Sequence, residues 1–211
     1  MKEKYFSIKE EIHVKQKVGA CRFFGSARPV HTEEQANSFI DEVKEKFPNA
    51  SHYVYAYVIS DSDNPIVKYS DDGEPANSSG PPVLQSIETR DLTNVIVVIT
   101  RYYGGVNQGF GGLIRAYGST ASLALENCTI TEYELFQRIK VKPVEYSQLG
   151  DIIHFVESFG GSITDIEYGA DVIVLAELKN DVLDKFKIKV RDITKGRGQL
   201  VLGEQIWKRK K

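Results

Sequence analysis

The strongest constraint on the fold is a run of five β-branched residues, Val95 to Ile99, which continues into Thr100. A continuous run of this length is typical of a strand that is buried on both faces, because neither face carries polar side chains. The run leads directly into Arg101-Tyr102-Tyr103 and the glycine-rich segment GGVNQGFGG. A helix is predicted from about Gly111 to Asn127, where apolar side chains recur every three or four residues. The sequence therefore predicts a central strand, a glycine-rich turn and a helix that packs back on the sheet.

The chain has 211 residues, a length that fits either one large domain or two small ones. After Cys128 the pattern changes, and a strand, helix, strand, strand, helix and strand are predicted between Glu134 and Trp207. This βαββαβ order is ferredoxin-like, and about 80 residues can complete such a unit with its own core. We therefore predict an α+β protein with two domains, residues 1–130 and residues 131–211. The four terminal cations, Lys208 to Lys211, are expected to form a solvated tail that could add nonspecific affinity for RNA.

Composition narrows the possible classes of protein. The 27 positive and 29 negative side chains leave a formal charge of -2, which argues against a generally basic nucleic-acid binder but permits a local basic patch. The apolar runs are shorter than the roughly 20 residues that span a bilayer, and the N-terminal segment resembles neither a signal peptide nor a transit peptide. Cys21 and Cys128 are too few for a disulfide framework or a zinc site, and both are predicted to be small core residues. We expect a cytoplasmic protein without a membrane partner or a cofactor.

Acidic side chains gather in the segment Ser70 to Pro75, at the start of a loop rich in glycine and serine. Asp71, Asp72 and Glu74 could hold a divalent cation or pair with arginines. Their spacing is not that of the twelve-residue calcium loop, because no further ligands follow at the required positions. Caps and salt bridges that fix the loop are the simpler explanation.

The glycine-rich turn after Arg101 is a second candidate site. Glycines let the backbone approach a ligand closely, and the amides of a helix N-terminus attract anions such as phosphate. The turn matches neither a P-loop nor a dinucleotide fingerprint, so a tight strand-to-helix connection explains it equally well. Arg115 falls in the first turns of the predicted helix, where its charge opposes the helix dipole. An external anion would resolve this conflict, and so would an internal pair between Arg101 or Arg115 and one of the loop carboxylates.

His52 opens a predicted strand and could act as a base or contact a phosphate, although a lone histidine is more often structural. No nucleophile motif is present, and the sequence identifies no catalytic residue and no set of metal ligands.

The ordered series of motifs resembles the family known as Impact or YigZ, and the resemblance extends over nearly the whole chain. The matching segments are His52-x-x-x-Ala56-Tyr57, Asp72-Gly73-Glu74-Pro75, Ser78-Ser79-Gly80-Pro81-Pro82, Val97-Val98-Ile99-Thr100-Arg101-Tyr102-Tyr103-Gly104-Gly105, Gly109-Phe110-Gly111-Gly112-Leu113 and Arg115-Ala116-Tyr117.

The resemblance implies a fold and a function. It implies a first domain like the second domain of a small-subunit ribosomal protein, and a second domain like a late domain of elongation factor G, both of which sit on ribosomal RNA. A eukaryotic member is linked to translational control, through competition for the activator of a kinase that acts on an initiation factor. Because this chain carries the βαββαβ domain instead of the eukaryotic partner-binding module, that particular interaction is not carried over.

The implied function is that of a translation-associated regulatory or binding protein, which contacts RNA, the ribosome or a translation-regulator protein through the glycine-rich cleft of the first domain. The alternative is an enzyme or small-ligand protein that binds a phosphorylated compound at the same cleft. A third interpretation is an interaction module whose loops only brace two domains.

The resemblance also selects candidate site residues. Asn107 and Gln108 stand where the family commonly has a lysine and a leucine, and the loss of that lysine removes a phosphate contact. Ala76-Asn77 stands where the family often has Ser-Gly. The candidate ligand-binding or functional-surface residues are His52, Asp71, Asp72, Gly73, Glu74, Pro75, Arg101, Tyr102, Gly104, Gly105, Gly109, Gly111, Gly112, Arg115 and Tyr117.

Overall fold

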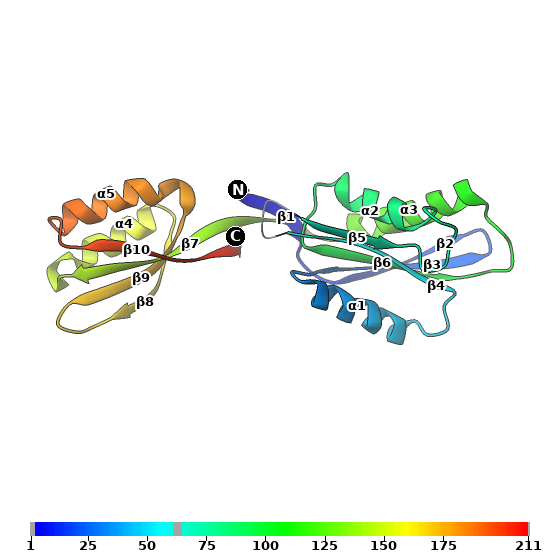
Figure 1. Ribbon diagram of the computed structural model, residues 1–211, viewed down its shortest axis with the longest axis horizontal. Coiled ribbons are helices and arrows are strands. Elements are labelled where there is room, and N and C mark those ends of the chain that lie inside the picture. Colours follow the sequence, from blue (N-terminus) through cyan, green and yellow to red (C-terminus); the bar gives the residue numbers. More distant parts are fainter. Residues whose placement is uncertain (1–2, 61–64, 211) are drawn as a thin grey trace. The chain divides into compact units, whose positions relative to one another are not determined.

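The computed structural model describes residues 3–60 and 65–210 of the chain (Figure 1). The chain divides into two compact units, Met1–Glu132 and Tyr133–Lys211. No helix in the described ranges is long and apolar enough to cross a membrane. Lys211, the last cation of the predicted tail, lies outside the described residues.

The first unit contains an antiparallel sheet with the strand order β2-β3-β6-β4-β5. Strand β6 is central, and each of its residues from Val95 to Arg101 is buried, as the β-branched run predicts. The short strand β1 forms a parallel bridge between Phe6 and Leu92. The elements of this unit are β1 (Lys4–Ile8), β2 (Ile12–Val18), β3 (Cys21–Pro29), α1 (Glu33–Lys46), β4 (His52–Ile59), β5 (Ile66–Ser70), α2 (Gly80–Glu88), β6 (Val95–Tyr102) and α3 (Phe110–Glu126).

Helices cover both faces of this sheet, with α1 on one face and α2 and α3 on the other (Figure 1). Successive side chains of a strand point to opposite faces, so the β-branched run of β6 supplies two cores. Ile96 and Val98 pack in the core that includes the α1 residues, whereas Val97 and Ile99 pack in the core that includes α2 and α3. The strand can therefore be continuously apolar, because neither of its faces meets water.

The predicted helix start at Thr32 is observed. The Thr32 side chain accepts a hydrogen bond from the Gln35 N–H, and the Gln35 side chain accepts one from the His31 N–H. The two capping contacts fix the position at which the chain enters α1.

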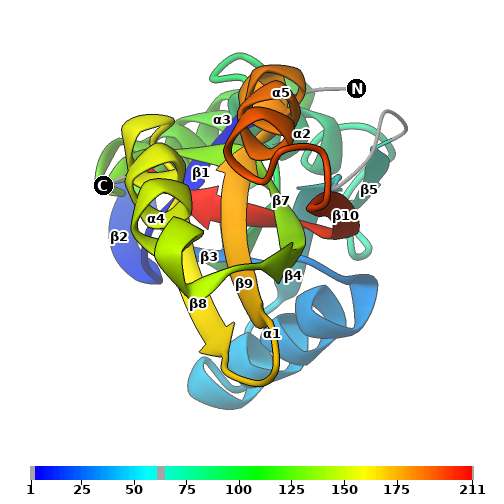
Figure 2. The same cartoon turned by 90° about the vertical axis from the view of Figure 1, so that its left-hand side faces the viewer.

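The second unit has the predicted βαββαβ order, and its strands lie in the order β10-β7-β9-β8. This is the strand order of a ferredoxin-like fold, and α4 and α5 lie on the same side of the sheet (Figure 2). Its core joins Val141 and Val174 of the sheet to Val156 of α4 and Phe186 of α5. The elements are β7 (Ile130–Val144), α4 (Leu149–Ser158), β8 (Ser162–Glu167), β9 (Val172–Lys179), α5 (Leu183–Ile193) and β10 (Gln199–Arg209), with short 3-10 turns at Tyr146–Gln148 and Asn180–Val182.

The expectation of a solvated terminal tail is wrong for Lys208 and Arg209, which belong to β10. Lys208 pairs in register with Glu134, and Arg209 pairs with Tyr133. The antiparallel ladder with β7 continues to this point, and the backbone hydrogen bonds of the pairing hold the strand.

Candidate functional site

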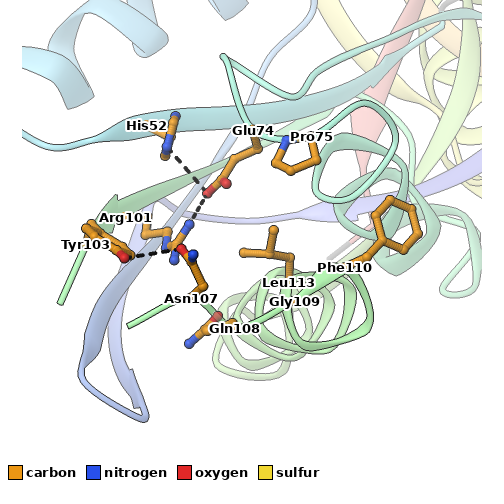
Figure 3. A pocket seen from close by; sticks show the side chains of 10 residues that line it. All are labelled: His52, Glu74, Pro75, Arg101, Tyr103, Asn107, Gln108, Gly109, Phe110 and Leu113. Atoms are coloured by element: carbon orange, nitrogen blue, oxygen red, sulfur yellow. Dashed lines mark hydrogen bonds and ion pairs between the residues drawn. The ribbon is translucent and has the colours of Figure 1, made fainter. Parts of the chain in front are cut away.

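The glycine-rich turn and the acidic loop meet at a pocket of about 530 Å³ in the first unit (Figure 3). Its walls come from the first residue of β4, the loop after β5, the end of β6, the glycine-rich turn after β6 and the first turn of α3. The lining residues are His52, Glu74, Pro75, Arg101, Tyr103, Asn107, Gln108, Gly109, Phe110 and Leu113.

A buried ion pair lies at the wall of this pocket. Glu74 is 9% exposed and Arg101 is 4% exposed, and the Arg101 Nη1 donates to the Glu74 Oε1 over 2.6 Å. The hydroxyl of Tyr117, from α3, donates to the same oxygen over 2.5 Å. The Nε2 of His52 lies 3.7 Å from it on the other side. One carboxylate oxygen thus joins side chains from β4, β6 and α3, and it fixes these elements around the pocket (Figure 3).

The surroundings of Arg101 explain why a charge is retained at the end of a buried strand. Its Nη2 donates to the Cys21 sulfur over 3.4 Å, and its guanidinium carbon lies 5.7 Å and 5.4 Å from the ring centroids of Phe23 and Tyr103. Burial alone would lower the pKa of Arg101, but the hydrogen bonds to Cys21 and Glu74 raise it. The guanidinium therefore stays charged and needs a buried counter-ion, which Glu74 supplies.

Tyr117 is held in its neutral form. Burial raises its pKa, and the hydrogen bond to Glu74 and the charge of that carboxylate raise it further. The hydroxyl is therefore a permanent donor to Glu74, which makes it a structural support of the ion pair.

Asp71, in the same loop as Glu74, accepts hydrogen bonds from the backbone instead of pairing with an arginine. Its carboxylate accepts hydrogen bonds from the backbone N–H groups of Asn77, Ser79 and Gly80 and from the Ser79 hydroxyl, over 2.7 to 3.0 Å. Burial would raise the pKa of Asp71, but these hydrogen bonds, that of the Gly80 N–H first among them, lower it below the usual value. The carboxylate caps the start of α2, in agreement with the simpler explanation of the acidic cluster.

Asp72 ties the loop to β4. Its Oδ2 accepts from the Tyr53 N–H over 2.6 Å, and its carbonyl oxygen lies 2.8 Å from the Nδ1 of His52. A carbonyl oxygen can only accept, so Nδ1 carries the proton of that contact. In the described part of the chain no group of three His, Cys, Asp or Glu side chains is arranged to hold a metal ion. Each of the three carboxylates thus has its own protein partners: the start of α2 for Asp71, the Tyr53 N–H for Asp72, and Arg101 with Tyr117 for Glu74.

At two positions of the glycine-rich turn the backbone requires glycine. A Cβ atom at Gly104 would lie 2.1 Å from the carbonyl oxygen of Ala20, so no side chain fits there. Gly109 is the N-cap of α3 and has a φ of +70°, a conformation that L side chains rarely adopt.

The N-terminus of α3 lies at the pocket, and its N-cap residue, Gly109, has no side chain that could cap it. Asn107 and Gln108, in the middle of the turn, both form side-chain hydrogen bonds. Asn107 Oδ1 accepts from the Tyr103 hydroxyl over 3.2 Å, and Gln108 Nε2 donates to the Val18 carbonyl over 2.9 Å. Arg115 is exposed, does not line the pocket and, among the residues described, has no carboxylate partner. The predicted internal pair thus forms between Arg101 and Glu74.

The structure brings together only part of the candidate set. His52, Glu74, Pro75, Arg101 and Gly109 line the pocket. Tyr117 reaches Glu74 from α3 without lining the pocket. The lining residues that were not among the candidates are Tyr103, Asn107, Gln108, Phe110 and Leu113, and the signal that could have found them is the presence of large side chains within a glycine-rich turn. The candidates that do not line the pocket are Asp71, Asp72, Gly73, Tyr102, Gly104, Gly105, Gly111, Gly112, Arg115 and Tyr117.

Large apolar side chains are exposed beside the pocket. Tyr103, Val106, Phe110 and Ile114 are between 37% and 62% exposed. Phe110 and Ile114 are one helical turn apart and so share a face of α3. In Figure 3 the Phe110 ring points away from the ion pair. We refer to these four residues as the apolar rim.

The fold and this site define a mixed α/β protein of two domains with a candidate binding pocket in the first. Residues 19–125 match the family model of the Impact N-terminal domain, and residues 144–197 match the model described as Domain of unknown function (DUF1949). The chain therefore belongs to the IMPACT family.

Two curated relatives and one solved structure match nearly the full length. The IMPACT family member YvyE of Bacillus subtilis is 33% identical, over 97% of this chain and 93% of its own. The IMPACT family member YigZ of Escherichia coli is 30% identical, over 92% of this chain and 95% of its own. A solved structure titled "Crystal structure of an hypothetical protein" has a TM-score of 0.69 and 28% identity, and the match covers 97% of this chain and 99% of that one.

Proposed function

We propose that this protein is a translation-associated binding protein, which contacts RNA, the ribosome or a translation regulator through the pocket and the apolar rim of its first unit. The observation that carries the proposal is the rim: its four large apolar side chains are exposed, and two of them, Tyr103 and Phe110, line the pocket. Contiguous exposed apolar side chains are typical of binding surfaces, because a monomer gains nothing from leaving them in water. The link to translation comes from the resemblance to the family, whose eukaryotic member is linked to translational control, and relatives named Protein IMPACT and Protein IMPACT homolog match part of this chain.

The polar wall of the pocket favours binding over acid–base chemistry. The Glu74 carboxylate accepts hydrogen bonds from Arg101 and Tyr117, so the addition of a proton to it would break a buried ion pair. A fixed ion pair beneath exposed aromatic and aliphatic side chains gives a rigid surface of defined shape. Such a surface loses little conformational entropy when a partner binds.

The test is sucrose-gradient sedimentation of cell lysate at about 50 and about 150 mM salt, with the protein followed by antibody. We expect wild type to migrate with ribosomal particles at both salt concentrations, because a held complex does not depend on weak charge attraction. The variant Tyr103→Ala/Phe110→Ala is expected to stay at the top of the gradient. Both residues are exposed, so the fold should be retained.

Tyr168→Ala is the matched control, because this tyrosine is 66% exposed and lies in the second unit. It should sediment like wild type. A wild type that stays at the top at both salt concentrations would overturn the proposal, and so would a rim variant that still migrates with ribosomal particles.

One observation favours a second function, the binding of a small phosphorylated compound. The N-cap residue of α3, Gly109, has no side chain, and Gly109 and Phe110 line the pocket, so backbone N–H groups at the start of the helix could donate hydrogen bonds to a phosphate there. Thermal unfolding with nucleoside monophosphates tests this function. The melting temperature should rise with ligand concentration and should not rise with the corresponding nucleosides. Equal shifts with both sets, or no shift with either, would exclude it.

A further inference from the structure

Strand β5 is an edge of the sheet in the first unit, and no described strand pairs with its outer side (Figure 2). At the edge of a sheet, the backbone N–H and C=O groups of alternate residues point outward without a partner strand. Residues 66–69 are all exposed. The strand therefore presents a row of backbone donors and acceptors to the solvent.

The exposed side chains of β5 are mostly apolar. Ile66 is 46% exposed, Val67 is 45% exposed and Tyr69 is 43% exposed. Residues that are directly opposite in an antiparallel pair point to the same face of the sheet. Val67 lies opposite Val58, which packs in the core with α2 and α3, and Ile66 lies opposite Ile59, which packs in the core with α1. The strand thus exposes apolar side chains on both faces of the sheet.

Natural edge strands are protected against further pairing by a proline, a bulge or a free charge. The register of β5 with β4 is continuous over all five residues, so no bulge twists the edge away. Pro65 precedes the strand, and none of the strand residues is a proline. The charge of Lys68 has a partner, because its Nζ lies 3.7 Å from the Oε1 of Glu33. The strand itself therefore has none of the three protections.

Three other edge strands of the described chain differ from β5 in this respect. Strand β2 carries Lys15 and Lys17, which are exposed and form no ion pair with a described residue, and its apolar side chains pack against the core. In the second unit, β8 and β10 each have a register shift in the pairing with their neighbour. The unprotected edge is therefore a particular property of β5 and not a general feature of these sheets.

The aromatic side chain of β5 is fixed in position beside α2. A Cβ atom at Gly80 would lie 2.6 Å from the Cδ2 of Tyr69, so the ring packs closely on the first residue of the helix. The Tyr69 hydroxyl donates to the Oδ1 of Asn77 over 3.4 Å. A side chain that is already ordered loses little conformational entropy when a partner packs on it.

The geometry of the edge limits what can occupy it. An extended polypeptide backbone matches the outward groups, because its own N–H and C=O groups repeat every second residue at the same spacing. A second copy of this chain fits poorly. Five residues span about 17 Å, and pairing over that length buries far less than the roughly 1,000 Å² of a stable interface between folded proteins. Antiparallel pairing of two copies about the middle of β5 would also place two equivalent lysines, Lys68 of each copy, directly opposite each other.

We propose that β5 binds an extended peptide segment of a protein partner, which adds a sixth strand to the sheet of the first unit. Backbone hydrogen bonds hold the segment, and aliphatic side chains at alternate positions pack on Val67 and Tyr69. The positions between them carry uncharged polar side chains, because Lys68 and Glu33 already neutralise each other. This surface shares no residue with the pocket or the apolar rim and does not rest on the function proposed for them.

The test is fluorescence anisotropy of the peptide Gly-Ser-Thr-Val-Thr-Val-Thr-Ser-Gly, labelled with fluorescein and titrated with the full chain. Its valines and threonines alternate, so the extended peptide has one apolar and one polar, uncharged face. We expect a saturable rise in anisotropy with a Kd below about 500 µM, as for a weak and transient complex. The same peptide methylated at the backbone nitrogens of its three central residues keeps its side chains but loses the donors for strand pairing. It should bind at least about tenfold more weakly.

The variant Ile66→Lys/Val67→Lys places a charge on each face of the edge, a change that protects natural edge strands. It should bind the unmethylated peptide at least about tenfold more weakly than wild type does. Both side chains are about half exposed, so the fold should be retained, which far-UV circular dichroism checks. The matched control Tyr168→Lys/Ile188→Lys adds the same two charges at side chains that are 66% and 61% exposed in the second unit. It should bind within about twofold of wild type.

Four outcomes would overturn the proposal. The first is the absence of binding by wild type up to about 500 µM protein. The second is equal affinity for the methylated and unmethylated peptides, since strand pairing would then not hold the segment. The third is equal weakening in the two double variants, because added charge alone would explain it. The fourth is a wild-type dimer that Ile66→Lys/Val67→Lys dissociates, which would show that β5 pairs with a second copy of the chain.

Discussion

Removal of the negative charge from Glu74 should destabilise the first unit strongly. Glu74→Gln keeps the shape of the side chain and an oxygen for the Tyr117 hydroxyl, but it leaves the buried Arg101 guanidinium without a counter-ion. Breaking a buried ion pair from one side typically costs about 3 to 5 kcal/mol. The pair adjoins an open pocket, where water can partly solvate the arginine, so we expect the lower end, about 3 kcal/mol.

Urea unfolding of the full chain measures this cost. With an m value near 2 kcal/mol per M, a loss of about 3 kcal/mol lowers the midpoint of the first unit by about 1.5 M. Far-UV circular dichroism follows both units. The chain has one tryptophan, Trp207, which lies in β10, so its fluorescence reports the second unit. The Trp207 transition should not move.

Two further variants make this prediction sharp. Glu126→Gln removes a carboxylate that is 62% exposed and pairs with Arg90, and it should cost less than about 1 kcal/mol. Glu74→Gln/Arg101→Met removes both buried charges and should be more stable than Glu74→Gln alone. A midpoint for Glu74→Gln within about 0.5 M of wild type, or equal to that of Glu126→Gln, would refute the reasoning.

Three more outcomes follow from the geometry. Gly104→Ala should lower the free energy of unfolding, measured in urea melts, by more than about 2 kcal/mol, because the new methyl group meets the Ala20 carbonyl. Gly150→Ala is the control: it has open space around it and should stabilise the second unit by about 0.5 kcal/mol. Because the folded-state pKa of Asp71 is lowered, its stabilising contribution is complete above the unfolded pKa near 3.9 and is lost as the pH falls through the folded value. Asp71→Asn should therefore be less stable than wild type at pH 6, and the difference should shrink below about pH 4. Urea midpoints of both proteins measured across this pH range test the prediction. A difference that stays constant with pH would contradict it. Burial, and then the charge of Glu10, raises the pKa of Cys128 to about 11. The Cys128 thiol should therefore react with iodoacetamide at pH 8.5 more than about tenfold more slowly in native protein than in urea-unfolded protein. Equal rates would show that the thiol is not protected.

Charged side chains occupy two kinds of environment in this chain. Arg101 is neutralised within its own unit and holds the pocket in shape. The cations of α5 form no ion pair with a described residue and are exposed at the surface. Net charge, which is -2 for the whole chain, does not distinguish these two situations.

The sequence by itself determined the elements that depend on neighbouring residues. The β-branched run predicted β6, the capping pattern at Thr32 predicted the start of α1, and the order of strands and helices after Cys128 predicted a ferredoxin-like unit. The pattern is local in each case, because the period of a strand or a helix is set within a few residues. The motif resemblance also identified the family.

Only the tertiary structure decided which carboxylate meets which cation. Asp71, Asp72 and Glu74 are equivalent as nearby acids in the sequence, but positive φ angles at Asp72 and Gly73 turn the chain so that Asp71 caps α2 and Glu74 enters the core. Arg101 and Glu74 are 27 residues apart, and their contact depends on how the loop after β5 folds over the end of β6. The pairing of β9 with β7 likewise places Lys179 beside Glu134. Such long-range pairings follow from the packing of whole elements, and no local pattern of residues encodes them.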